Sequence, residues 1–262
     1  MHKSTSRNNG DFIRQVATLT AIIGTFVVNV YSNIFPLNGM SIGEISNTLF
    51  ANVLIIPANY AFAIWGLIYL GLFAFAIYQF LPNQGHDVDL RNTGYFLVIA
   101  SIAQIIWVYL FLSRLFTLSV IAILFILLPL IAAYLRLRIG KKRVSHDKKW
   151  CVHFPISIYL GWISVATIVN VASALYFQGW NRWGLSAELW TAMMLLVAFT
   201  IAAVMVIQGR DFAYTGVTVW ALVAIALKQS NSSLLRNLAL VSAIALVLMI
   251  VMKCIKNEPR GT

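Results

Sequence analysis

The chain has 262 residues, of which 60% are hydrophobic and only 10% are charged. A soluble domain carries about 25% charged residues, so this composition excludes an ordinary soluble fold. The formal net charge of +11 would suit a nucleic-acid-binding protein, but no basic stretch lies within a soluble fold of the kind that such proteins use. We therefore expect no nucleic-acid partner, and interpret the basic residues as anchors of cytoplasmic loops.

Windows of about 20 apolar residues recur along the chain, and each predicts a membrane-spanning helix. The sequence lacks the ten-residue alternation that is typical of spanning β-strands. We therefore predict an all-α, polytopic helical bundle with about eight transmembrane helices. They are expected at residues 13–34, 57–81, 93–113, 116–136, 151–177, 187–208, 212–229 and 235–254. The seventh is short, and without it the count falls to seven.

The distribution of Lys and Arg predicts the orientation of these helices. With the N-terminus in the cytoplasm, 15 of these residues fall on cytoplasmic segments and 4 on outer segments, as the positive-inside rule requires. The C-terminus is then also cytoplasmic. We expect an integral membrane protein of the bacterial inner membrane, in contact with the lipid bilayer. The basic loop RIGKKRVSHDKK, residues 138–149, either contacts anionic lipid as a topology anchor or binds a protein partner.

The longest predicted outer loop, residues 35–55, contains no Lys or Arg. Pro36 and the pair Asn38-Gly39 are turn formers. Its apolar residues would allow it to fold back over the bundle as a lid, and an exposed connector is the alternative.

The search for catalytic groups is negative. All eight acidic residues lie in loops or at helix ends, whereas ion-coupled transporters usually place ionisable residues inside the membrane. No signature of a hydrolase, nucleotide-binding or metal site is found. His153, the only histidine near a span, is interpreted as an interfacial residue rather than a haem ligand. We expect no enzyme activity, no metal site and no required cofactor.

Aromatic and amide residues remain as candidates for a site. Gln104, Trp107 and Phe111 share one face of the third predicted helix, and Tyr159, Trp162, Ala166 and Asn170 share one face of the fifth. An amide within a membrane needs a partner, so both amides should point into the bundle. These residues either pack helix against helix or line a pocket for a flat apolar ligand.

Three segments carry a family resemblance. In the second predicted helix, Pro57 precedes Trp65 by eight residues and Tyr69 follows by four. The third contains QIIWVYLF, and the fifth contains YLGWISVATIVN. These segments resemble the TspO/MBR family of translocator, or tryptophan-rich sensory, proteins. The sequence departs from the family pattern at Gln104, where Asn is usual, and in the 35–55 loop, which has no Trp.

The resemblance covers about residues 13–177 and implies a five-helix bundle within 1–177, followed by three additional helices within 178–262. It also implies a hydrophobic small-molecule ligand, either a porphyrin- or haem-type tetrapyrrole such as protoporphyrin or a sterol-like molecule. The alternative is a transporter or facilitator of a small amphipathic molecule. Members often form homodimers. The residues expected to bind the ligand are Trp65, Tyr69, Gln104, Trp107, Phe111, Tyr159, Trp162, Ala166 and Asn170.

Overall fold

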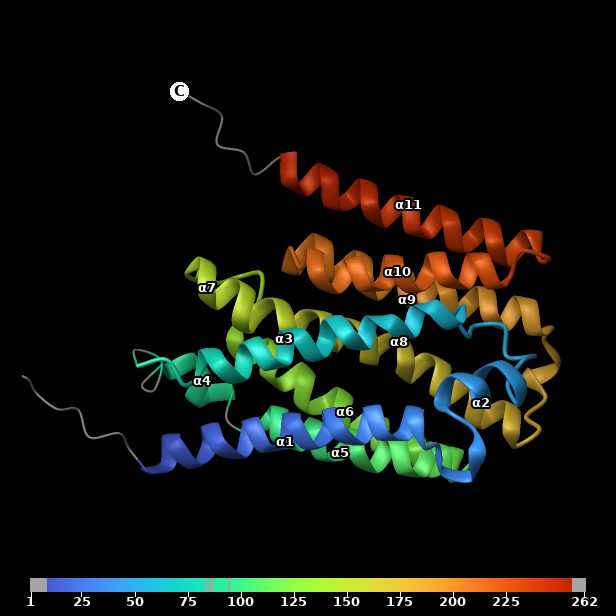
Figure 1. Cartoon of the computed structure of the whole chain (residues 1–262). Helices are drawn as coiled ribbons and strands as arrows, with labels where there is room; N and C mark the ends of the chain where they lie inside the picture. The colour runs from blue at the N-terminus through green and yellow to red at the C-terminus, as the bar shows by residue number, and fades with distance from the viewer. Residues whose placement is uncertain (1–8, 83, 85–86, 94, 256–262) are drawn as a thin grey trace, which may run out of the picture.

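The computed structural model describes residues 9–82, 84, 87–93 and 95–255. These residues form helices and no strand, which confirms the predicted all-α membrane fold. In the described part of the chain, eight apolar helices make up the bundle, and their arrangement is drawn in Figure 1. They are α1 (Asn9–Ile34), α3 (Ile64–Tyr78), α5 (Phe96–Leu112), α6 (Phe116–Leu137), α8 (Phe154–Phe177), α9 (Ala187–Gly209), α10 (Phe212–Lys228) and α11 (Ser233–Ile255).

Six of the predicted spans are long and apolar enough to cross a membrane, and the other two, α5 and α10, are apolar helices of 17 residues each. Short elements connect them. These are η1 (Leu37–Gly39), α2 (Ile42–Thr48), η2 (Asn59–Ala63), α4 (Val88–Thr93), α7 (His146–Lys148), η3 (Lys149–His153) and η4 (Arg182–Gly184).

Two helices begin differently from the prediction. The second span starts as the 3₁₀ turn η2, since Pro57 has no N–H and the Ala58 N–H bonds to Ala224 O of α10, 3.1 Å away. The fifth span starts with the π turn η3, immediately before Pro155. Pro155 cannot donate the regular helical hydrogen bond, which accounts for the irregular first turn.

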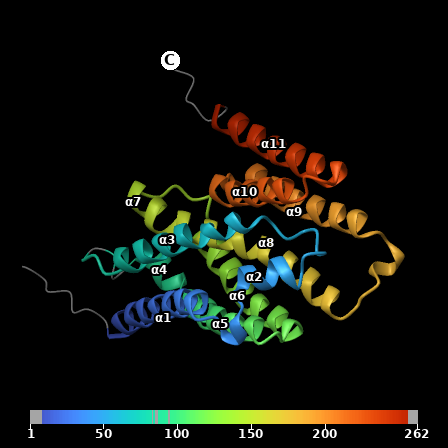
Figure 2. The ribbon, with the colours of Figure 1, turned by 45° about the vertical axis from the view of Figure 1, so that its right-hand side comes forward.

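The helices form layers that are visible in two views. α1, α5 and α6 lie on one side, α3 and α8 follow, then α9 and α10, and α11 is outermost (Figures 1 and 2). One buried apolar cluster runs through these layers, from Ile22 to Leu246. α10 packs closely on α8 at Gly161, where an added Cβ would lie 3.1 Å from Tyr214 O. The predicted division after residue 177 therefore falls within a continuous core.

α1 begins and α11 ends at the same end of the bundle (Figure 1). α4, α7 and the 138–149 loop lie there too, and we call this the basic end. Lys148 bonds to Asp87 and Asp89, and Lys142 bonds to Asp89. Arg91 pairs with Asp11. Four residues that we assigned to the cytoplasm, Lys3, Arg7, Lys256 and Arg260, lie outside the described residues.

The opposite end carries α2 and the segment that leads to α3, and we call it the lid end. Here residues 35–55 fold back onto the bundle, as the lid interpretation predicts. Ile45 and Phe50 are fully covered, and Ser41 and Glu44 form a capping box that starts α2. The loop is thus a structured cover and not an exposed connector.

Candidate functional site

A cavity lies below α2 at the lid end, between α3, α5, α6 and α8. About 580 Å³ within the cavity and its mouth is not filled by atoms, and the centre of a water-sized molecule can reach about 50 Å³ of it. Seven of the nine residues predicted from the sequence line this cavity. They are Trp65, Gln104, Trp107, Phe111, Trp162, Ala166 and Asn170.

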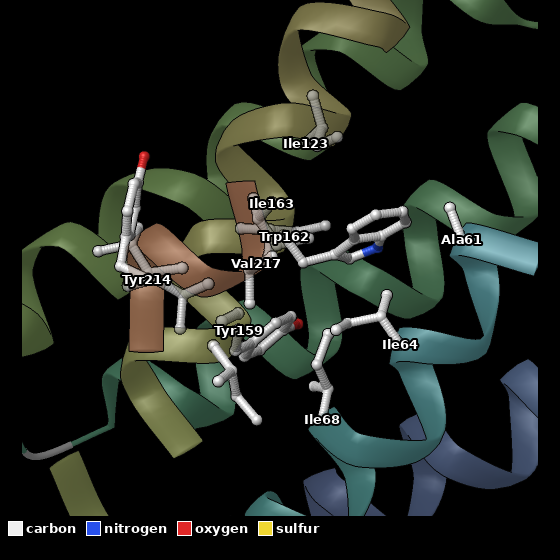
Figure 3. Close-up of a cluster of buried hydrophobic side chains, with 14 of the residues drawn as sticks. Ala61, Ile64, Ile68, Ile123, Tyr159, Trp162, Ile163, Tyr214 and Val217 are labelled. Atoms are coloured by element: carbon white, nitrogen blue, oxygen red, sulfur yellow. The ribbon is translucent and has the colours of Figure 1, made fainter. Parts of the chain in front are cut away.

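Three helices present tryptophan rings to the cavity: Trp65 from α3, Trp107 from α5 and Trp162 from α8. Trp162 of α8 extends toward the segment that holds Ala61 (Figure 3), and its ring meets the Phe62 ring edge-on with centroids 5.9 Å apart. Trp107 of α5 stacks on Phe111, one helical turn later, with centroids 5.1 Å apart. Rings at these separations form favourable aromatic pairs, and together they give the cavity flat apolar walls.

Tyr69 and Tyr159, the other two predicted residues, lie behind this wall. The Trp65 ring stacks on Tyr69, with centroids 5.7 Å apart, and meets Tyr159 at 6.0 Å. Tyr69 donates a 3.3 Å hydrogen bond to Thr25 O of α1, and Tyr159 is 1% exposed. Both tyrosines are therefore placed to hold Trp65 in position.

Asn170 is fully engaged by neighbouring helices. Its Oδ1 accepts from Trp107 Nε1 at 2.7 Å, and its Nδ2 donates to Ser119 Oγ of α6 at 2.9 Å. This triangle joins α5, α6 and α8 inside the membrane region. The side-chain amide partner predicted for Asn170 is thus present, and it fixes the orientation of the Trp107 ring.

Gln104 also points into the bundle, but the expected partner is missing. The residue is 1% exposed, and neither Nε2 nor Oε1 has a hydrogen-bond partner among the described residues. Burial of an unpaired amide costs about 1–3 kcal/mol. Gln104 points into the bundle as predicted, but the partner that such an amide needs does not come from the described part of the surrounding helices. The free amide instead offers one donor group and one acceptor to the cavity.

Among the residues that sequence reasoning missed, three are informative. Ser119 lies in an apolar helix with no distinguishing pattern, and the packing of α6 against α8 is what brings it to Asn170. Ile42 and Ser46 of α2 line the cavity from above. The only sequence signal for them was the apolar character of the 35–55 loop, which does not specify where the loop folds.

Every residue that lines the cavity is uncharged. Within the described ranges, no group of three or more His, Cys, Asp or Glu residues is close enough to hold a metal ion. His153 is 6% exposed and so is buried among helices at the basic end. The cavity can therefore bind by shape, aromatic stacking and neutral hydrogen bonds.

Charged chemistry is concentrated at the basic end. Burial alone would raise the pKa of Asp89, but hydrogen bonds from Lys142 and Lys148 outweigh it, so the pKa of this carboxyl lies below its usual value. The ionised form is favoured there, and Lys142 and Lys148 compensate it. This cluster is consistent with a structural tie between α4 and the 138–149 loop.

Comparison with family models gives a match to one described as TSPO-like protein, over residues 15–252. The match extends through all eight apolar helices, including the three beyond residue 177. The chain matches no curated protein and no solved structure. The family match covers most of the chain, and the apolar helices are those of a protein that lies in a membrane. This chain is therefore an integral membrane protein that belongs to the TSPO-like protein family.

Proposed function

We propose that this protein is a membrane receptor or sensor that binds a flat apolar ligand in the cavity below α2. The observation that carries the proposal is Gln104, on the wall of a cavity lined by tryptophans, whose buried amide has no partner among the residues that the structure describes. A bound molecule with one polar group would satisfy the amide, and its flat face would stack between the rings.

A tetrapyrrole such as protoporphyrin fits this chemistry, and a sterol-like molecule is the second ligand class. Ligand pockets for drug-sized molecules hold roughly 300–1,000 Å³, whereas the centre of a water-sized molecule can reach only about 50 Å³ of this cavity. The lining must therefore move apart to admit a ring system. The α2 cover and Pro57 are the parts of the lining that lie outside the transmembrane helices.

The direct test is titration of the purified protein with protoporphyrin IX, followed by tryptophan fluorescence quenching. Ala166→Leu narrows the cavity and should weaken binding at least tenfold. Ala245→Leu makes the same change in half-buried α11, away from the cavity, and should leave the affinity unchanged. Equal affinity in both variants would remove the cavity as the binding site, and saturable binding of cholesterol alone would select the sterol-like class.

A transporter or facilitator is the second candidate function. Two features weigh against coupling to ions: the cavity lining is uncharged, and α2 covers one side of it. Passive movement of a neutral or amphipathic molecule is compatible with both features. Reconstituted vesicles loaded with protoporphyrin would separate the functions, since a facilitator releases the ligand across the bilayer and a receptor retains it.

We propose no enzyme activity, and we propose that the basic end faces the cytoplasm of a bacterial cell. The orientation rests on the pairing of α4 with the basic loop at one end and on the positive-inside rule. Cys254 lies exposed in the last turn of α11, so an impermeant maleimide should label it only after the membrane is opened. Ser230→Cys, at the lid end, should be labelled in intact cells.

A further inference from the structure

The segment that closes the cavity is held from behind by α10. Pro57 and Phe62 of this segment line the cavity. Leu54, Ala58 and Ala61, which alternate with them along the chain, are hydrogen-bonded to α10. The segment 54–62 is thus a wall between the cavity and α10, and we call it the closing segment.

The hydrogen bonds to the closing segment run along the C-terminal half of α10. Trp220 Nε1 donates to Ala61 O at 3.0 Å, and Gln229 Nε2, in the residue after the helix, donates to Leu54 O at 2.9 Å. Between them, Ala224 O accepts the 3.1 Å bond from Ala58 N–H. The closing segment has irregular backbone around Pro57, so its carbonyl groups need partners from outside it.

α10 is also connected to α2, the helix that covers the cavity. Lys228 Nζ donates to Asn47 Oδ1 of α2 at 3.0 Å, and Asn47 contacts Asn59 Oδ1 at 3.4 Å. The Trp220 ring also meets the Tyr60 ring edge-on, with centroids 5.1 Å apart. α10 therefore contacts both parts that close the lid end, although no residue of α10 lines the cavity itself.

α10 is suited to this task because its own position is fixed. It packs against α8 at Gly161, where the two backbones approach closely, and α8 supplies Trp162 to the cavity. Figure 3 shows Val217 of α10 beside Trp162 and Ile163 of α8. One helix thus supports two walls of the cavity from behind.

We infer that α10 positions the closing segment, through Trp220 and Gln229, and thereby sets how often the cavity opens. Trp220 and Gln229 are positioning residues: they act on the cavity only through the closing segment. This gives the three helices beyond residue 177 a role in the same site. The part of the inference that concerns a ligand rests on the proposed function, whereas the part that concerns the closing segment does not.

The test is amide hydrogen exchange of the full-length protein in detergent, followed in residues 54–62. Trp220→Phe keeps an aromatic ring and removes the donor, and Gln229→Met keeps the length of the side chain and removes its amide. The loss of one hydrogen bond should speed exchange of the closing segment about three- to tenfold. Trp150→Phe, at the basic end, should change nothing there.

Unchanged exchange in residues 54–62 of both variants would overturn the inference. Exchange that becomes faster by the same factor in α1 and α5 would also overturn the inference, because it would show that the variant destabilises the whole fold. In a second arm, protoporphyrin IX should dissociate at least threefold faster from either variant. If protoporphyrin IX does not bind even the unaltered protein, the proposed function fails, and the exchange of the closing segment still decides the inference.

Discussion

The two ends of the bundle treat buried polar groups differently. At the basic end, Asp87 and Asp89 are paired with Lys148 and Lys142 at 2.5–2.9 Å. At the cavity, Gln104 is buried and has no partner among the described residues. A buried polar group is normally paired. Buried atoms without a partner among the described residues also occur at the basic end, as at His153 Nε2, so the difference between the two ends is one of charge. The paired charged groups of the basic end hold helices together, whereas the amide of Gln104 stands on the wall of an uncharged cavity.

The largest expected loss of stability comes from a substitution at the basic end. Lys148→Met leaves two carboxylates short of a partner, and their side chains are only 16% and 11% exposed. Removal of one partner from a buried ion pair costs roughly 3–5 kcal/mol, so we expect about 3 kcal/mol at this partly exposed site. Equilibrium unfolding in detergent measures the loss.

Lys149→Met is the control for that substitution, since Lys149 is exposed and has no salt bridge in the described part of the chain. Protoporphyrin affinity should be the same in both variants. A comparable loss of stability in the two would show that net charge, and not pairing, decides the stability of the basic end.

The second largest loss of stability is expected at Asn170, the amide that is paired. Asn170→Ala leaves Trp107 Nε1 without its acceptor, so the free energy of unfolding should fall by about 1–3 kcal/mol. The freed Trp107 ring should also weaken ligand binding. Asn52→Ala, which removes an exposed bond to Tyr176, should have a smaller effect on stability and none on binding. Equal losses of stability would contradict a special role of the Asn170 triangle.

A smaller loss of stability is expected at low pH, when Asp89 becomes protonated. The folded-state pKa of Asp89 is lowered, so the stability that its ionised form contributes is complete above its unfolded pKa of about 3.9 and is lost as pH falls through the folded value. Unfolding followed from pH 6 to pH 3 should show this loss below about pH 4. Asp89→Asn should flatten the profile, and an unchanged slope would show that Asp89 is not responsible.

Periodicity predicted the helices and the direction of the side chains well. The third and fifth predicted helices each present one face, and this was enough to bring Gln104, Trp107, Trp162 and Asn170 to one cavity. Length and apolar composition were enough to predict the eight apolar helices of this chain, since a hydrophobic segment in lipid has few alternatives to a helix.

The remaining details depend on contacts between segments distant in sequence. Ser119 reaches Asn170 across 51 residues, and Trp220 reaches Ala61 across 159. No local pattern encodes such pairs. The absence of a partner for Gln104 could not be predicted either, because the general rule that buried amides are paired points the other way.

The most direct measurement is made on Gln104→Leu, whose unfolding free energy and protoporphyrin affinity are both determined. Without ligand, removal of an unpaired buried amide should leave stability unchanged or raise it by about 1 kcal/mol. The affinity should fall about tenfold, which corresponds to the loss of about 1.4 kcal/mol in binding. A variant that is less stable but binds as tightly as the unaltered protein would contradict the proposal, because Gln104 would then be a packing residue with a partner of its own.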